Sequence, residues 1–195
     1  MTIPLKSFYF IRHGETDWNK RGLIMGSKDI ELNSHGISQA EEAKHGLKDE
    51  DIGEIYASSL KRASHTANIL NQVLNLPITY TDLLWERGWG VSEGDHVDSF
   101  KTIFAKRLDD IEDHEIPIDA ETWTQFRARI IIALMEILKD SQKPPLIVSH
   151  GGVLRGITAI LGIHDVHPKN CEAYLFRPSD GISEKWSVVS LEDSM

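Results

Sequence analysis

Two apolar runs that lie far apart in this chain end in the same way. Each passes into a polar residue, a histidine and glycine, in Phe8–Gly14 (FYFIRHG) and in Leu146–Gly152 (LIVSHGG). Runs that are apolar at every position are typical of strands buried on both faces, as in a parallel sheet covered by helices. Because the carboxyl ends of neighbouring parallel strands meet at one crevice, we expect His13 and His150 to face each other there.

The rest of the chain continues this alternation of short apolar runs with helical patterns. We expect strands near Ser7–Ile11, Glu54–Ala57, Ile78–Tyr80, Leu146–Val148, Ala173–Phe176 and Trp186–Ser190. Helices are expected at Ser34–Lys48, Ser59–Leu74, Thr122–Lys139 and Val153–Leu161, with Ser34 as the cap of the first. This order predicts a three-layer α/β/α sandwich with a mainly parallel central sheet.

A length of 195 residues with 41% hydrophobic residues suits one compact domain over 1–195. The alternation breaks once, around 95–122, where a cap-like excursion over a substrate fits, although nine acidic against three basic residues suit a solvated face equally well. No apolar stretch approaches the roughly 18 residues that a membrane span needs, and Cys171 is the one cysteine. We therefore expect a cytoplasmic protein with no membrane contact, no disulfide and no structural zinc site.

A formal net charge of −9 argues against a nucleic-acid surface, because such surfaces neutralise many phosphates with Lys and Arg. A small anionic substrate is compatible with this charge, since a few arginines in a cleft attract one phosphate even on an acidic protein. Arg62 lies in the first turn of an expected helix, where a cation normally opposes the helix dipole. That placement makes sense if Arg62, Arg12 and free backbone N–H groups hold an anion together.

The string Arg12–Asn19 (RHGETDWN) is similar to the signature of the histidine phosphatase superfamily, the phosphoglycerate mutase-like proteins. Four later segments resemble further motifs of that family, in the family's order: Gly26–Ala40, Ser58–Ala67, Glu86–Gly94 and Ser149–Gly152. The resemblance spans most of the chain. It implies a phosphoglycerate mutase-like fold and a phosphatase that uses neither a metal nor a cofactor.

The resemblance also implies roles for individual residues. His13 becomes the phosphorylated nucleophile and Glu86 the proton donor, while Arg12, Arg62 and His150 complete the catalytic set. The residues implied to bind the substrate phosphate are Arg12, Thr16, Asn19, Gly26, Arg62, His150 and Gly151. The expected partners are a small phosphorylated substrate and inorganic phosphate as the product. The oligomeric state stays open, a homodimer included.

These residue types suit phosphoryl transfer, which needs an in-line nucleophile, a cationic cradle and a proton for the leaving oxygen. Histidine keeps a free ring nitrogen near neutral pH when its other nitrogen is held as a donor, commonly by a backbone carbonyl. A protonated His150 is expected to join Arg12 and Arg62 in neutralising the phosphoryl oxygens. Glu86 must carry a proton in the first step and can accept one from water in the second.

Two features of the expected site need separate treatment. Met25 stands before Gly26, where the family commonly has a polar residue, and a thioether cannot donate a hydrogen bond. We expect this difference to change the substrate preference more than the catalysis. Glu15 and Glu93 are rival candidates for the acid, and Glu86 is favoured because it occupies the family's acid position.

Two other functions remain open at the level of the sequence. A phosphoglycerate mutase would return the phosphoryl group to a bound carboxylate-bearing product. Arg87 directly follows the acid, as in mutases, so this alternative stays open. The acidic balance of 95–122 favours the phosphatase instead. A catalytically weak regulator that binds phosphorylated ligands is disfavoured by the complete set of expected catalytic residues.

The remaining histidines and the aromatic residues carry weaker signals. His164 and His167 lack a further ligand cluster and are not expected to bind a metal. Five other histidines are expected to be structural or surface residues: His35, His45, His65, His96 and His114. Five aromatic side chains are expected to line either a substrate pocket or the core: Trp85, Trp89, Phe100, Phe104 and Trp123.

Overall fold

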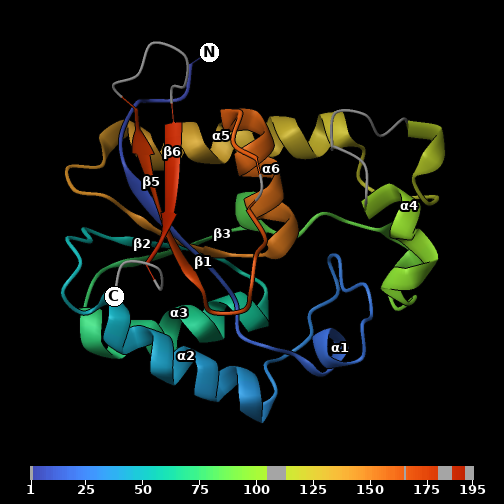
Figure 1. The fold of residues 1–195 in the computed structure, drawn as a ribbon, viewed down its shortest axis with the longest axis horizontal. Helices are drawn as coiled ribbons and strands as arrows, with labels where there is room; N and C mark the ends of the chain where they lie inside the picture. The colour runs from blue at the N-terminus through green and yellow to red at the C-terminus, as the bar shows by residue number, and fades with distance from the viewer. Residues whose placement is uncertain (1, 105–112, 165, 180–185, 192–195) are drawn as a thin grey trace.

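The computed structural model describes residues 2–104, 113–164, 166–179 and 186–191, which form a central sheet between two layers of helices (Figure 1). The strands are β1 (Phe8–Arg12), β2 (Ile55–Ser58), β3 (Ile78–Thr81), β4 (Leu146–Ser149), β5 (Ala173–Pro178) and β6 (Trp186–Ser190). The helices are α1 (Asp17–Lys20), α2 (Ser34–Leu47), α3 (Lys61–Leu74), α4 (Lys101–Phe104), α5 (Trp123–Asp140) and α6 (Gly151–Leu161). Short 3-10 turns cover Asp82–Leu84, Gly90–Ser92, Val97–Phe100 and Asp113–Glu115.

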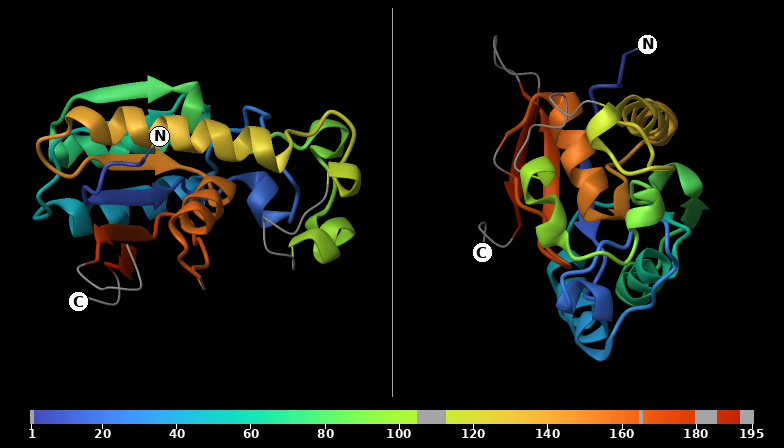
Figure 2. Two further views of the ribbon diagram at one scale, coloured as in Figure 1. Left: turned by 90° about the horizontal axis from the view of Figure 1, so that it is seen from above. Right: turned by 90° about the vertical axis from the view of Figure 1, so that its right-hand side faces the viewer.

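The sheet has the strand order β3-β2-β4-β1-β5-β6. Strands β3, β2, β4 and β1 run parallel to one another, whereas β5 runs antiparallel to both β1 and β6. The expectation of an α/β sandwich with a mainly parallel sheet is therefore confirmed. In Figure 2 the arrowheads of the parallel strands point to the end of the molecule where α1 and α4 lie.

Alternating side chains of the sheet build two cores, one on each face. Phe8 and Phe10 of β1 pack with α5 and α6, around Phe126, Ile130 and Leu154. Tyr9 and Ile11 of the same strand pack on the opposite face with residues of α2 and α3 (Figure 1). Strands β1 and β4 are buried in the middle of these layers, so the residues directly after them are held on a rigid base.

Several ends of elements differ from the expectation for physical reasons. The cap of α2 is Asn33 and not Ser34, because the Asn33 side chain accepts the hydrogen bond from the N–H of Gly36. Helix α3 begins at Lys61, after Leu60 in extended conformation, and α6 begins at Gly151, two residues earlier than expected. Helix α1 was not predicted at all.

The excursion around 95–122 is present as the turn Val97–Phe100, helix α4 and the turn Asp113–Glu115. It lies beyond the carboxyl ends of the parallel strands (Figure 2). Residues 105–112, which carry part of its acidic charge, lie outside the described residues. Among the described helices, none combines the length and the apolar character that crossing a membrane requires.

Candidate active site

His13 directly follows β1, and its ring is held in one tautomer. The backbone N–H of His13 donates to the carbonyl of Ser149 at 2.9 Å, which ties the residue to the end of β4. In the ring, Nδ1 lies 2.7 Å from the carbonyl oxygen of Gly14, so Nδ1 carries the proton and donates it. The lone pair of the neutral ring is therefore on Nε2, as nucleophilic attack requires.

His150 follows β4 and lies beside His13, with 5.2 Å between the ring centroids. The two strands pair in parallel, with Arg12 opposite Ser149, so the expected meeting of the two histidines is confirmed. Nδ1 of His150 accepts a hydrogen bond from Nε of Arg62 at 3.2 Å. Its Nε2 must then carry the proton, which it donates to the hydroxyl of Ser58 at 2.8 Å.

The surroundings of both rings favour the neutral form. Burial, followed by the charges of Arg62 and Arg12, holds the pKa of His13 well below its usual value. Burial and then Arg62 lower the pKa of His150 in the same way, with smaller effects from His13 and Arg12. The expectation of a protonated His150 is thus wrong for the free protein, because a buried ring facing a guanidinium is a poor place for a second positive charge.

These lowered pKa values predict that stability falls in mild acid. Below the unfolded histidine pKa of about 6.5, the unfolded chain binds protons that the folded chain does not, so unfolding becomes easier as the pH drops. The two histidines should lower the free energy of unfolding by roughly 1.4 kcal/mol each per pH unit between about pH 6 and 5. Urea unfolding at pH 7, 6 and 5 measures this slope, and the exposed His65→Gln variant should keep it. A stability that is flat over this range would contradict the assignment.

Arg62 lies at the start of α3 and is completely buried. Its guanidinium donates to His150, to the carbonyl of Lys28 at 2.6 Å and to the carbonyl of Gly26 at 2.9 Å. Burial lowers the pKa of Arg62 to about 10, so the group is still charged at neutral pH. The expected free N–H at the helix start is partly in use, because that of Lys61 donates to the Asp29 carboxylate at 2.7 Å.

Arg12 is the last residue of β1. Its Nη1 donates to the carbonyl of Pro168 at 2.9 Å. Its Nε is buried and has no hydrogen-bond partner within residues 2–104, 113–164, 166–179 and 186–191. A Cβ atom at Gly151 would lie 3.4 Å from this nitrogen, which is an ordinary van der Waals contact. An anion at the start of α6 would therefore find an unused donor on Arg12.

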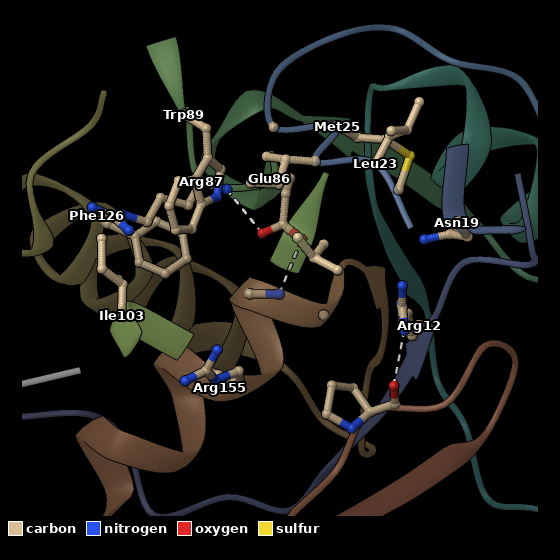
Figure 3. A pocket seen from close by; sticks show the side chains of 16 residues that line it. Arg12, Asn19, Leu23, Met25, Glu86, Arg87, Trp89, Ile103, Phe126 and Arg155 are labelled. Carbon is tan, nitrogen blue, oxygen red and sulfur yellow. Dashed lines mark hydrogen bonds between the residues drawn. The ribbon is translucent and has the colours of Figure 1, made fainter. Parts of the chain in front are cut away.

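Glu86 is fixed against the start of α6. One carboxylate oxygen accepts from the N–H of Gly152 at 3.0 Å, and the other accepts from the N–H of Arg87 at 2.9 Å (Figure 3). Helix α6 has no side-chain cap from His150, so Glu86 supplies one of the acceptors that its first turn needs. A Cβ atom at Gly152 would lie 2.3 Å from the nearer oxygen of Glu86, so only glycine admits the carboxylate there.

We predict that Gly152→Ala displaces the Glu86 carboxylate and lowers kcat by about 10²–10³, the usual contribution of a general acid. The fold should survive, because alanine is well tolerated in a helix. Steady-state kinetics with a phosphate ester measures the loss. Gly46→Ala in α2 is the matched control, because a Cβ there meets nothing within 4 Å. An unchanged kcat in Gly152→Ala would show that Glu86 need not hold this position.

A cavity of about 250 Å³ opens beside these groups. Arg12, Asn19 and Glu86 line it (Figure 3), together with Gly26 and Gly151. Most of the other lining residues are apolar: Leu23, Ile24, Met25, Trp89, Val97, Ile103 and Phe126. The rest of the wall is formed by Arg87, Gly152, Arg155 and Pro168.

Of the aromatic side chains considered for the pocket, Trp89 lines the cavity. Phe100 packs against Trp89 at 5.7 Å between ring centroids, and Trp123 belongs to the core on the α5 side. The indole N–H of Trp85 donates to the hydroxyl of Ser59, away from the cavity. The side chain of Phe104 lies outside the described residues. Phe126, which belongs to the core on the α5 side, reaches the cavity as well.

Thr16 and Met25 have roles that the motif did not indicate. Thr16 is fully buried and caps α1 in a reciprocal box with Asn19, so its hydroxyl is already engaged within the protein. The same hydroxyl donates to the sulfur of Met25 at 3.2 Å. The thioether thus serves as an acceptor, while Asn19 and Met25 both face the cavity (Figure 3).

Glu93, a rival candidate for the acid, joins two loops instead. One of its oxygens accepts from the N–H of Ser27 at 2.7 Å and from the N–H of Trp89 at 3.1 Å. Gly26 has a positive φ of 51°, and a Cβ there would lie 2.1 Å from the same oxygen. Glycine is therefore needed at Gly26 both for its conformation and for the approach of Glu93. Glu15 accepts from the side chain of Asn33 at 2.9 Å, beside the start of α2.

The segment that leads into Glu86 is held in place by an ion pair that the sequence did not indicate. Arg129 of α5 pairs with both carboxylate oxygens of Glu121, at 2.9 and 2.7 Å. Its Nη1 donates to the carbonyls of Leu83 at 3.0 Å and Trp85 at 2.9 Å, on the segment that leads into Glu86. The sequence of this region predicts only a helix, because an ion pair between residues eight positions apart produces no periodic pattern.

The seven other histidines are all exposed, as expected for surface residues. Within the part of the chain that the structure describes, no group of three or more His, Cys, Asp or Glu side chains is placed to hold a metal ion.

The sequence of this chain is similar to those of several known proteins. The sequence profile of the histidine phosphatase superfamily (branch 1) matches residues 8–188. The "Uncharacterized phosphatase PhoE" of Bacillus subtilis is 35% identical over 75% of this chain and 72% of its own length. The "Probable phosphoglycerate mutase GpmB" of Salmonella arizonae is 34% identical over 95% of this chain and 92% of its own.

Solved structures share the fold at lower identity. "Mycobacterial hydrolase 1" superposes with a TM-score of 0.79 at 23% identity, covering 94% of this chain and 96% of that one. A mycobacterial glucosyl-3-phosphoglycerate phosphatase gives a TM-score of 0.77 at 23% identity over 94% and 97% of the two chains.

Proposed function

Because this chain belongs to the histidine phosphatase superfamily, we propose that it hydrolyses a small phosphomonoester through a phosphohistidine at His13. The observation that carries the proposal is the hydrogen bond from Nδ1 of His13 to the Gly14 carbonyl, which leaves the Nε2 lone pair free. The lowered pKa of the ring keeps that lone pair available at neutral pH.

In the first step, Nε2 of His13 attacks phosphorus in line with the leaving oxygen. The bond between phosphorus and that oxygen breaks as Glu86 gives the oxygen a proton, so an alcohol departs. Arg12 and Arg62 balance the charge on the equatorial oxygens, and the unpaired Nε of Arg12 is one donor ready for them. His150 enters this step as a neutral ring.

In the second step, water attacks the phosphohistidine and Glu86 accepts its proton. The bond between phosphorus and Nε2 breaks, inorganic phosphate leaves and both residues return to their starting state. Because cationic side chains serve as the cradle, we include metal independence in the proposal.

Turnover of phenyl phosphate tests this proposal. Release of inorganic phosphate is expected, and it should continue at the same rate in excess chelator. Activity that disappears with chelator and returns with added zinc or magnesium would contradict the metal-free mechanism. An inactive protein that still binds phosphate would instead support a regulator that recognises phosphorylated ligands.

A mutase is the second candidate, and two observations favour it. Relatives named as phosphoglycerate mutases match almost the whole chain, and Arg87, next to the acid, lines the cavity. Incubation with 3-phosphoglycerate and a bisphosphoglycerate primer separates the two functions. A phosphatase releases inorganic phosphate from the mixture, whereas a mutase forms 2-phosphoglycerate without it.

A further inference from the structure

The backbone that carries the His13 ring is held by hydrogen bonds from three distant parts of the chain. The carbonyl of His13 accepts from the side-chain amide of Asn170 at 2.7 Å. The N–H of Gly14 donates to the hydroxyl of Thr66 at 3.1 Å, and that hydroxyl donates in turn to the carbonyl of Arg62 at 2.8 Å. The peptide group between His13 and Gly14 therefore has a partner for both its oxygen and its nitrogen.

The next peptide group, between Gly14 and Glu15, carries the carbonyl that holds the proposed nucleophile. Its oxygen accepts from Nδ1 of His13 at 2.7 Å. Its nitrogen is the amide of Glu15, which donates to Oε1 of Gln39 at 2.9 Å. A trans peptide group is planar, and its C=O and N–H point in opposite directions. The Gln39 oxygen on one side of this plane therefore fixes the direction of the Gly14 carbonyl on the other side.

The start of helix α2 brings Gln39 to this peptide group. A Cβ atom at Gly36 would lie 2.1 Å from the carbonyl oxygen of Glu15 and 2.5 Å from its nitrogen. A Cβ atom at Gly14 would lie 2.3 Å from the carbonyl oxygen of Gly36. Gln39 follows Gly36 by three residues, so both lie on the same face of α2. The close approach of two glycines thus puts the Gln39 side chain within reach of the loop.

The hydrogen bond to Gln39 also strengthens the one to His13. A peptide group that donates through its N–H becomes a better acceptor through its carbonyl, because hydrogen bonds in a chain polarise one another. In a neutral imidazole, the hydrogen bond made by one ring nitrogen decides which nitrogen carries the proton. Without Gln39 the Gly14 carbonyl would hold Nδ1 less firmly. The proton would then spend part of its time on Nε2, the nitrogen that must attack phosphorus.

We propose that Gln39 is a positioning residue that keeps the proton of His13 on Nδ1 and so leaves Nε2 ready to attack. Gln39 lines a separate cavity of about 500 Å³ beside α2, and not the cavity proposed for the substrate. It therefore acts through the peptide group between Gly14 and Glu15, without touching the substrate. The catalytic consequence rests on the proposed function, whereas the position of the proton can be measured without any substrate.

Nitrogen NMR of the free protein, with labelled nitrogen in the histidine rings, reads the position of this proton. A protonated and an unprotonated ring nitrogen have well separated shifts, and the signals that disappear in His13→Ala belong to His13. At neutral pH the wild type should show a protonated Nδ1 and an unprotonated Nε2. In Gln39→Leu both shifts should move toward those of the other tautomer. Gln39→Glu keeps an oxygen acceptor and should keep the wild-type shifts.

Turnover of phenyl phosphate measures the catalytic consequence. Gln39→Leu should lower kcat about tenfold, which corresponds to the net contribution of one hydrogen bond. Inhibition by inorganic phosphate should be unchanged, because Arg12 and Arg62 remain. Gln39→Glu should recover most of the lost rate. Gln72→Leu is the matched control, since Gln72 is exposed on α3 and accepts from Nζ of Lys44 at 3.0 Å.

Leucine is a good helix former, so Gln39→Leu should fold, and Gln39→Ala removes the same oxygen without adding bulk. Wild-type shifts of His13 in both variants would show that Gln39 does not set the tautomer, and the inference would be wrong. A Gln39→Glu as slow as Gln39→Leu would also overturn it, because packing alone would then explain the loss. If the wild type does not hydrolyse phenyl phosphate, the proposed function fails, and the NMR comparison still decides what Gln39 does.

Discussion

Replacing His13 by alanine is expected to reduce turnover by on the order of 10⁴-fold or more, as loss of a catalytic nucleophile does in other enzymes. The reason is specific to the site: the partner ring, His150, has Nδ1 bonded to Arg62 and Nε2 bonded to Ser58, so it cannot take over the attack. Release of phosphate from phenyl phosphate measures the loss. His65→Ala, an exposed histidine of α3, should remain fully active.

The His13→Ala variant should still fold and bind inorganic phosphate, because Arg12 and Arg62 remain. Circular dichroism and a phosphate-binding titration separate lost chemistry from lost structure. Residual activity close to that of the wild type would mean that another group attacks phosphorus, and the nucleophile assignment would then be wrong.

Arg62→Ala is expected to have the second largest effect. Removing this cation from the proposed cradle should lower kcat by on the order of 10²–10³, as loss of one preorganised donor does elsewhere. It should also destabilise the protein by several kcal/mol, at about 1–3 kcal/mol for each buried acceptor left unpaired. Those acceptors are the carbonyls of Gly26 and Lys28 and Nδ1 of His150.

Kinetics and urea unfolding of Arg62→Ala measure the two effects separately. Arg62→Lys keeps the charge without the planar fork, so it should recover only part of each. Lys61→Ala is the neighbouring control, because Lys61 is exposed and pairs with Glu31 on the surface. Normal kcat in a folded Arg62→Ala would place this guanidinium outside the reaction and reduce it to a structural role.

The framework of the site could be predicted from the sequence because it depends on local patterns. His13 and His150 each follow a fully apolar run, and parallel strands place such residues at one edge of the sheet. The positions of Arg62 and Glu86 followed from the resemblance of their motifs to a family.

What could not be predicted depends on contacts between distant residues. Asn33 and Ser34 are both good caps, and only the position of the Gly36 N–H decides between them. The protonation of His150 depends on where the guanidinium of Arg62 points, which no local pattern records.

The capping box of Thr16 and Asn19 could also have been predicted from the sequence, whereas the resemblance of the motif implied phosphate contacts for both residues.

Trapping the covalent intermediate tests the central claim most directly. The protein is mixed with excess labelled phenyl phosphate, quenched in alkali within one turnover, digested, and mapped by mass spectrometry. One phosphoryl group on the peptide that holds His13, stable in alkali and lost in acid, is the predicted result. A phosphoryl group on a different residue, or one that survives acid, would contradict the claim that the imidazole of His13 accepts it.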